Sequence, residues 1–86
     1  MQYLVIVEKA KNNYAAFSPD IPGCISTGKS IEDTLVEMRV ALQFHFEGLN
    51  EIPQPKGLRY YLDRGDLLHE EEALFTELEV HSRIAA

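Results

Sequence analysis

Carboxylates are the first side chains in this 86-residue sequence that could do chemistry, because acidic groups around a divalent cation can cleave phosphodiesters. Such a site needs several carboxylates within coordination distance of one ion. The first apolar run carries a single acid, Glu8, at its end, and Glu32 and Asp33 stand where a helix is predicted to begin. Acids in a first helical turn complement the helix dipole. We therefore predict no metal site and no nuclease centre.

Cysteine and histidine are the second candidates, as a nucleophile with its base or as metal ligands. The sequence has one cysteine, Cys24, and three histidines, His45, His69 and His81. It contains no Cys-x-x-Cys, no His-x-x-x-His and no glycine-rich phosphate loop. A lone cysteine in a short strand is typically a small buried hydrophobe. We predict no catalytic, cofactor-binding or metal-binding residue, and no enzyme.

Aromatic side chains on strands could stack nucleic-acid bases, as they do in sheets that bind single-stranded RNA. Those sheets interleave basic residues, whereas only Lys9, Lys11 and Arg59 lie near the aromatic residues in this sequence. We interpret the rings as core and interface residues. They are Tyr3, Tyr14, Phe17, Tyr60 and Tyr61.

The charge of the chain favours a basic protein partner. The formal net charge is −6, and residues 61–86 carry seven acidic and two basic side chains. No cluster of Lys and Arg is visible in the sequence, so direct binding to a phosphate backbone is disfavoured. The length predicts a single domain, residues 1–86. The lone cysteine and the lack of a signal peptide or membrane span predict a cytoplasmic protein.

Three strands are predicted in the first third of the chain. Residues 3–7 form an almost continuous apolar run, typical of a central strand that is covered on both faces. Residues 9–13 supply turn chemistry, which makes residues 14–17 the second strand of a hairpin. Residues 18–23 hold two prolines and a glycine and end that strand. Residues 24–27 are predicted to form the third strand.

A helix is predicted to begin after Ser30, which can cap it because Asp33 lies three residues further on. It is predicted to end near Gly48. One apolar row, at steps of three and four, is predicted to pack on the sheet: Ile31, Leu35, Met38, Leu42, His45 or Phe46, and Leu49. A second row at steps of four is available for a partner: Val36, Val40 and Phe44.

The rest of the chain is predicted to add strands. Residues 52–55 contain two prolines and cannot continue a helix. Residues 57–62 and 74–80 have strand character. Between them, Asp66 could cap a single turn over residues 67–73, and residues 81–86 are predicted to be a frayed tail.

The segment Pro19-Asp20-Ile21-Pro22-Gly23 allows two compatible interpretations. In the structural one, Asp20 accepts hydrogen bonds from neighbouring backbone amides and the prolines hold a rigid connection. In the other, a rigid and partly apolar loop contacts a protein partner, because little entropy is lost when it docks.

This segment also carries a resemblance to a known family. The run from Tyr14 to Asp33, followed by Glu37-Met38-Arg39 and by His45-Phe46-Glu47-Gly48-Leu49, resembles the HicB-like antitoxin family. Its hallmark is Pro19-Asp20-Ile21-Pro22-Gly23-Cys24 ahead of a helix capped by Gly28-x-Ser30, together with Ile52-Pro53-x-Pro55. The resemblance covers roughly residues 3–55.

The resemblance implies an α+β domain with a truncated ribonuclease-H-like β-β-β-α-β sheet that lacks the nuclease centre. It also implies a partner, a small basic HicA-type toxin that cleaves mRNA. Residues 1–55 would be the signature region and residues 56–86 an acidic, strand-like extension. Many family members carry a C-terminal ribbon-helix-helix or helix-turn-helix segment that binds operator DNA as a dimer or tetramer. Residues 56–86 do not resemble such a segment, so direct DNA binding is not expected.

The leading hypothesis is an antitoxin-like module that neutralises such a toxin by covering its active site, without a cofactor. The alternative is a self-assembling structural or regulatory domain with no toxin partner, and a homo-oligomer, a dimer or a tetramer, is expected. A residual nuclease is the least supported reading. The predicted protein-binding residues are Asp20, Ile21, Pro22, Gly23, Val36, Val40, Phe44, Glu70, Glu71 and Glu72.

Overall fold

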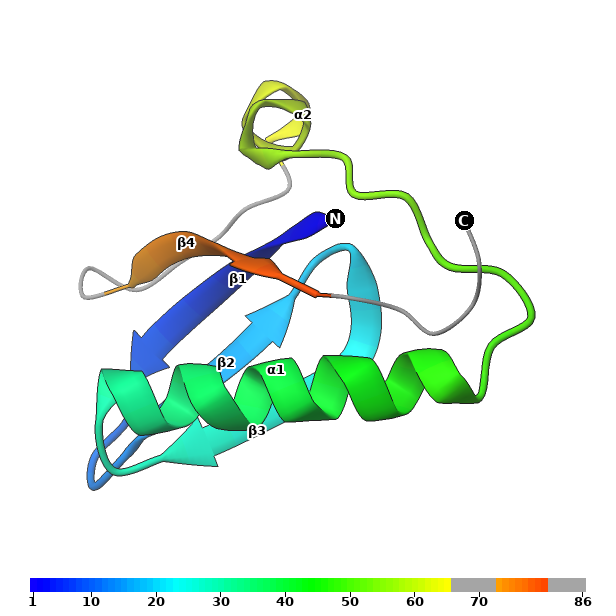
Figure 1. Ribbon diagram of the computed structural model, residues 1–86. Coiled ribbons are helices and arrows are strands. Elements are labelled where there is room, and N and C mark those ends of the chain that lie inside the picture. Colours follow the sequence, from blue (N-terminus) through cyan, green and yellow to red (C-terminus); the bar gives the residue numbers. More distant parts are fainter. Residues whose placement is uncertain (66–72, 81–86) are drawn as a thin grey trace.

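The computed structural model describes residues 1–65 and 73–80, which form a four-stranded antiparallel sheet and two helices (Figure 1). The order of strands across the sheet is β3-β2-β1-β4. The α+β class and the predicted order of three strands, a long helix and a last strand are confirmed. The elements are β1 (Gln2–Lys9), β2 (Tyr14–Ser18), β3 (Ile21–Gly28), α1 (Ile31–Glu47), α2 (Leu58–Arg64) and β4 (Leu74–Glu79).

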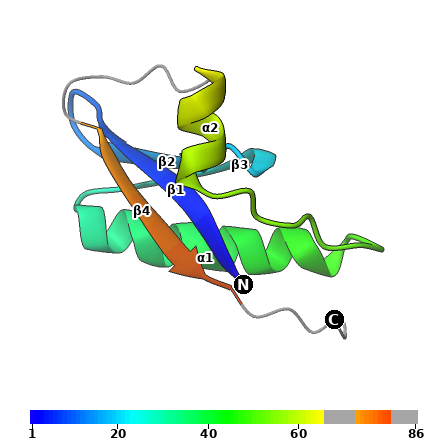
Figure 2. The same cartoon turned by 90° about the horizontal axis from the view of Figure 1, so that it is seen from above.

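Strand β1 is central and buried on both faces, as its apolar run predicts. Tyr3, Val5 and Val7 point into the core cluster under α1, and their exposed fractions are 1% or less. Because side chains alternate along a strand, Leu4 and Ile6 lie on the opposite face, where they are equally buried. Helix α1 crosses the first face and α2 lies over the second, as the views in Figures 1 and 2 agree.

Helix α1 begins and ends where the sequence predicts. The Ser30 hydroxyl accepts a hydrogen bond from the Asp33 backbone N–H at 3.0 Å, and Gly48 is the C-cap. Met38, Leu42 and Phe46 are buried against the sheet, whereas His45 is exposed, so Phe46 is the core residue of that pair. The second row, Val36, Val40 and Phe44, faces solvent.

Strand β3 begins earlier than predicted. The β2–β3 connection is a tight turn at Pro19 and Asp20, and pairing resumes at once between Ser18 and Ile21 after a register shift at the end of β2. Residues 21–23 therefore belong to the strand, although the sequence predicts a longer connection over residues 18–23. Pro22 is tolerated because β3 pairs only with β2 among the described strands and is an edge strand.

The strand predicted for residues 57–62 is wrong, because this segment forms the helix α2. Gly57 and Gly65 bound the helix at positive φ, and Gly65 is a left-handed C-cap. Tyr61 is buried, and Arg59 pairs with Asp63 one turn later at 3.2 Å. The strand predicted for residues 74–80 is confirmed as β4. The predicted turn at residues 67–73, apart from Ala73, and the predicted tail at residues 81–86 lie outside the described residues.

A membrane-spanning helix is not found among residues 1–65 and 73–80, since neither helix has the necessary length and apolar character.

Candidate protein-binding surface

Exposed apolar side chains gather where α1 lies beside the edge strand β3. The described residues include eight large hydrophobic side chains that are exposed, and four of them belong to these two elements. Phe44 is 75% exposed, Ile25 65%, Val36 56% and Val40 54%. Contiguous apolar surface on a small domain commonly marks an interaction site. We call these four residues and the groove between their elements the α1–β3 face.

A groove of about 400 Å³ runs between the two elements. Its floor contains Cys24, which is 7% exposed, and Ala41, which is partly buried against the core. Phe44 and Val40 of α1 and Ile25 of β3 are the exposed apolar residues that line it. The residues that line it are Gly23, Cys24, Ile25, Glu37, Val40, Ala41, Phe44 and His45.

Local structure explains why this groove stays open. Side chains alternate along β3, so Cys24 and Ser26 are buried on the α1 side, whereas Ile25 is exposed on the other face. On α1, residues 36, 40 and 44 lie one turn apart, on the side away from the sheet. No further strand covers the outer edge of β3 among the described residues.

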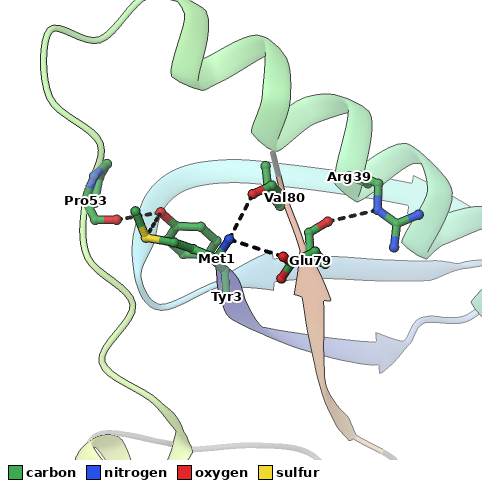
Figure 3. A network of polar contacts seen from close by, with 6 residues as sticks. All are labelled: Met1, Tyr3, Arg39, Pro53, Glu79 and Val80. Atoms are coloured by element: carbon green, nitrogen blue, oxygen red, sulfur yellow. Dashed lines mark hydrogen bonds and ion pairs between the residues drawn. The ribbon is translucent and has the colours of Figure 1, made fainter. Parts of the chain in front are cut away.

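The charge beside the groove is acidic. Glu37 lines it, and Asp33 stands one turn earlier in the same row of α1. Arg39 is directed to the other side of the helix, where its Nε donates to the Glu79 carbonyl oxygen at 3.3 Å (Figure 3). The described lining residues include no Lys or Arg. The groove therefore combines apolar walls with a carboxylate.

The contacts in Figure 3 hold the opposite edge of the sheet and the segment after α1 in place. The Met1 amino group donates to the Val80 carbonyl at 3.2 Å and pairs with Glu79 at 3.4 Å. The Tyr3 hydroxyl donates to the Pro53 carbonyl at 2.6 Å. Burial, and secondarily the negative charge of Asp20, raise the pKa of the Tyr3 phenol, so the neutral donor form is favoured.

Asp20 occupies a structural position. Its carboxylate accepts hydrogen bonds from the Leu4 N–H at 3.3 Å, the Lys56 N–H at 3.1 Å and the Tyr61 hydroxyl at 2.6 Å. These donors are distant in sequence, so the predicted bonds from neighbouring amides are wrong; instead the Asp20 N–H itself donates to the Ser18 hydroxyl at 3.2 Å. The carboxylate joins β1, the segment after α1, and α2.

Only part of the predicted contact loop, residues 20–23, is exposed. Asp20 is 9% exposed and Ile21 1%, so neither side chain belongs to an exposed contact surface. Pro22 and Gly23 are exposed, and Gly23 borders the groove. Glu70, Glu71 and Glu72 lie outside the described residues.

The environment of Cys24 does not favour a catalytic role. Cys24 and His45 both line the groove, but burial raises the pKa of the Cys24 thiol, which disfavours the nucleophilic thiolate. His69 and His81 lie outside the described residues. Within the described ranges, no three His, Cys, Asp or Glu side chains are placed to hold a metal ion.

Two features escape the sequence reasoning. Ile25 and Glu37 border the groove. The sequence signal for Ile25 is the alternation of exposed and buried residues along β3, and the signal for Glu37 is its position four residues after Asp33. Lys56 and Arg64 gather around Tyr60 on α2, with their charged groups 5.1 Å and 5.2 Å from the ring centroid. Their clustering depends on helical geometry, whereas the sequence predicts a strand there.

Comparison with known families decides the identity. Residues 3–74 match the family model described as the HicB-like antitoxin of bacterial toxin-antitoxin systems. The chain belongs to this family. It is a family of antitoxins and not of enzymes.

Solved structures share the fold of this chain. The N-terminal domain of the Burkholderia pseudomallei antitoxin HicB matches with a TM-score of 0.78 and 23% identity, over 94% of this HicB-like chain and 99% of that one. A chain in the structure of the HicA3 and HicB3 toxin-antitoxin complex matches with a TM-score of 0.74 and 27% identity, again over 94% and 99%.

Two relatives are similar in sequence. An uncharacterised 14.9 kDa protein of Haemophilus phage HP1 is 29% identical over 68 residues, which are 74% of this chain and 51% of the phage protein. A UPF0150 protein of Helicobacter pylori is 39% identical over 44 residues, or 51% and 61% of the two chains. The HicB-like chain thus spans about half to three fifths of the length of these relatives.

Proposed function

We propose that this HicB-like chain is an antitoxin that binds a small basic HicA-type toxin and covers its mRNA-cleaving active site. The α1–β3 face carries the proposal, because it is apolar, exposed and bordered by carboxylates. An apolar centre with charged surroundings is the usual anatomy of a protein interface. A similar fold in the HicA3 and HicB3 complex supports a partner of this kind.

The proposed mechanism is occlusion and requires no reaction by the antitoxin. The net charge of −6 attracts a basic ribonuclease and raises the rate of encounter. Apolar contacts then hold the complex and exclude RNA from the toxin. The proposed contacts are the exposed residues Pro22, Gly23, Val36, Val40 and Phe44, together with Glu70, Glu71 and Glu72 beyond the described part.

We place this activity in the cytoplasm, where mRNA is the substrate of the toxin. Direct binding of operator DNA by residues 1–86 is not part of the proposal, since their acidic charge repels phosphate.

Gene context and rescue test this function. We expect a gene for a small basic protein beside the gene of this chain, and co-purification of the two proteins. Co-expression of the chain should restore growth to cells that express the toxin. A chain that fails both to bind the toxin and to restore growth would refute the proposal.

Self-assembly is the second candidate function, favoured by the outer edge of β3, which no further strand covers among the described residues, beside the exposed row on α1. Small domains also gain stability by association. Light scattering on the purified chain would give its mass. We expect a dimer or tetramer whether or not a toxin is bound; a structural role alone requires an oligomer without any toxin partner.

A further inference from the structure

We propose that the groove between α1 and β3 receives one apolar side chain of the partner, together with an adjacent lysine or arginine that pairs with Glu37. This inference rests on the proposed function and identifies the part of the toxin that makes the central contact. The groove would thus bind an apolar side chain and a neighbouring cationic side chain on the surface of a basic protein.

The apolar part of the groove can receive a side chain of the partner. Of its apolar lining residues, Cys24 and Ala41 are the more buried, and Val40 and Phe44 of α1 and Ile25 of β3 are exposed. The groove is open to solvent, and its volume of about 400 Å³ leaves room for an apolar side chain. Energetic centres of interfaces are side chains of this type buried in pockets.

Gly23 leaves one end of the groove open. A Cβ atom at Gly23 would meet nothing within 4 Å, so the neighbouring space is empty. The φ angle of +88° is one that other residues rarely adopt, which accounts for glycine at this position. Backbone of the partner can therefore approach the edge of β3 closely at this end.

Glu37 supplies the charged part of the site. Glu37 lines the groove, and its carboxylate makes no ion pair with any residue in the described ranges. Asp33, one turn before it, adds a second negative charge, and Arg39 is engaged on the opposite side of α1. A lysine or arginine beside the apolar anchor would pair with Glu37. Salt screens an ion pair next to a buried apolar contact less than it screens a solvent-exposed ion pair.

The same charges disfavour a second copy of this chain as the occupant. Each copy has a net charge of −6 and would bring its own Asp33 and Glu37 toward the same face. Like charges brought together at an interface oppose association. A basic protein meets no such repulsion.

Binding of a catalytically inactive HicA-type toxin, encoded beside the gene of this chain, tests the inference with matched pairs of variants. Phe44→Ala removes an exposed apolar side chain inside the groove, and Leu62→Ala removes one on α2. We expect the dissociation constant to rise about 30-fold for Phe44→Ala and by less than about threefold for Leu62→Ala.

A second pair tests the charge. Glu37→Lys and Glu77→Lys change the net charge equally, but Glu77 lies on β4, at the far edge of the sheet. We expect about a tenfold loss of affinity for Glu37→Lys at low salt, which shrinks at high salt, and less than about threefold for Glu77→Lys. Thermal unfolding of each variant verifies the fold, and Val40→Thr, at a 54% exposed position that lines the groove, replaces Phe44→Ala if that variant is unstable.

The outcomes separate the inference from the proposed function. Failure of the unaltered chain to bind the toxin would refute the function itself. Tight binding by the unaltered chain and equally tight binding by the groove variants would overturn the inference and leave the function standing. Groove variants that break an oligomer of this chain but keep toxin affinity would also overturn it, because a second copy would then be the occupant.

Discussion

Replacing Asp20 with alanine removes the carboxylate on which three separate segments converge. Strand β2 pairs with β1 only from Ile6 onward, so the Leu4 N–H lies beyond the last pair. This N–H donates instead to the Asp20 carboxylate at 3.3 Å. Lys56 N–H and the Tyr61 hydroxyl are the other donors. At 9% exposure, water cannot readily replace this acceptor.

The magnitude follows from these three bonds. A hydrogen bond to a charged group contributes about 1.5–3 kcal/mol, and a buried donor left without a partner costs about 1–3 kcal/mol. Because the three bonds share one acceptor group, their contributions do not add fully. We expect Asp20→Ala to lower the free energy of unfolding by about 3–5 kcal/mol, a large share of the roughly 5–15 kcal/mol typical of a domain. Asp20→Asn keeps one acceptor oxygen and should lose about half as much.

Urea unfolding followed by circular dichroism measures this loss. Asp63→Ala is the matched control, because the Asp63 side chain is 67% exposed and pairs with Arg59 at the surface; we expect it to change the unfolding free energy by less than about 0.5 kcal/mol. Tyr61→Phe combined with Asp20→Asn gives the coupling between the two groups. A loss below about 1 kcal/mol for Asp20→Ala would show that the carboxylate does not hold these segments together.

Three further perturbations test the fold. Gly28→Ala should cost about 2 kcal/mol or more in urea unfolding, because its Cβ would lie 2.7 Å from the Thr34 hydroxyl and 2.8 Å from the Thr34 backbone nitrogen; a neutral effect would mean that α1 is not held this close to β3. Ser30→Ala should cost about 1 kcal/mol by loss of the helix cap, and unchanged stability would argue against capping. Burial raises the pKa of both Cys24 and Tyr3 in the folded chain, so the unfolded chain loses these protons first as the pH rises. The free energy of unfolding should therefore be highest at pH values below the ordinary pKa values of 9.0 for cysteine and 10.0 for tyrosine, and it should fall as the pH rises above them. The fall should be less steep for Cys24→Ala. A flat profile between pH 8 and 11 would contradict these shifts.

Local signals in the sequence predict much of the fold. The apolar run at residues 3–7 predicts the buried central strand, and the Ser30 cap with the periodicity that follows predicts α1 almost to the residue. Alternation predicts β4. These features depend on neighbours within a few positions, which a sequence displays directly.

Long-range contacts explain what the sequence does not predict. Asp20 meets donors 16, 36 and 41 positions away, and none of these partners can be inferred from spacing. Helix α2 has aromatic residues typical of a strand, and its anchoring through Tyr61 is visible only in three dimensions. The hallmark segment therefore combines a buried structural acid with an exposed end at Pro22 and Gly23.

The α1–β3 face also combines a part that the local sequence predicts with a part that depends on long-range contacts. The exposed row of Val36, Val40 and Phe44 follows from helical spacing alone. The groove needs Ile25 and Glu37 as well, and it arises only when β3 becomes the edge strand beside α1. Sequence periodicity thus identifies one wall of the candidate site, and the topology of the sheet supplies the other.

Titration of RNA cleavage tests the antitoxin assignment most directly. Purified HicA-type toxin, encoded beside the gene of this chain, would cleave a labelled RNA while increasing amounts of the chain are added. Occlusion of the active site predicts that cleavage falls linearly and stops once every toxin molecule is bound, and that Phe44→Ala requires much more protein. Undiminished cleavage at a large excess of a correctly folded chain would contradict the account.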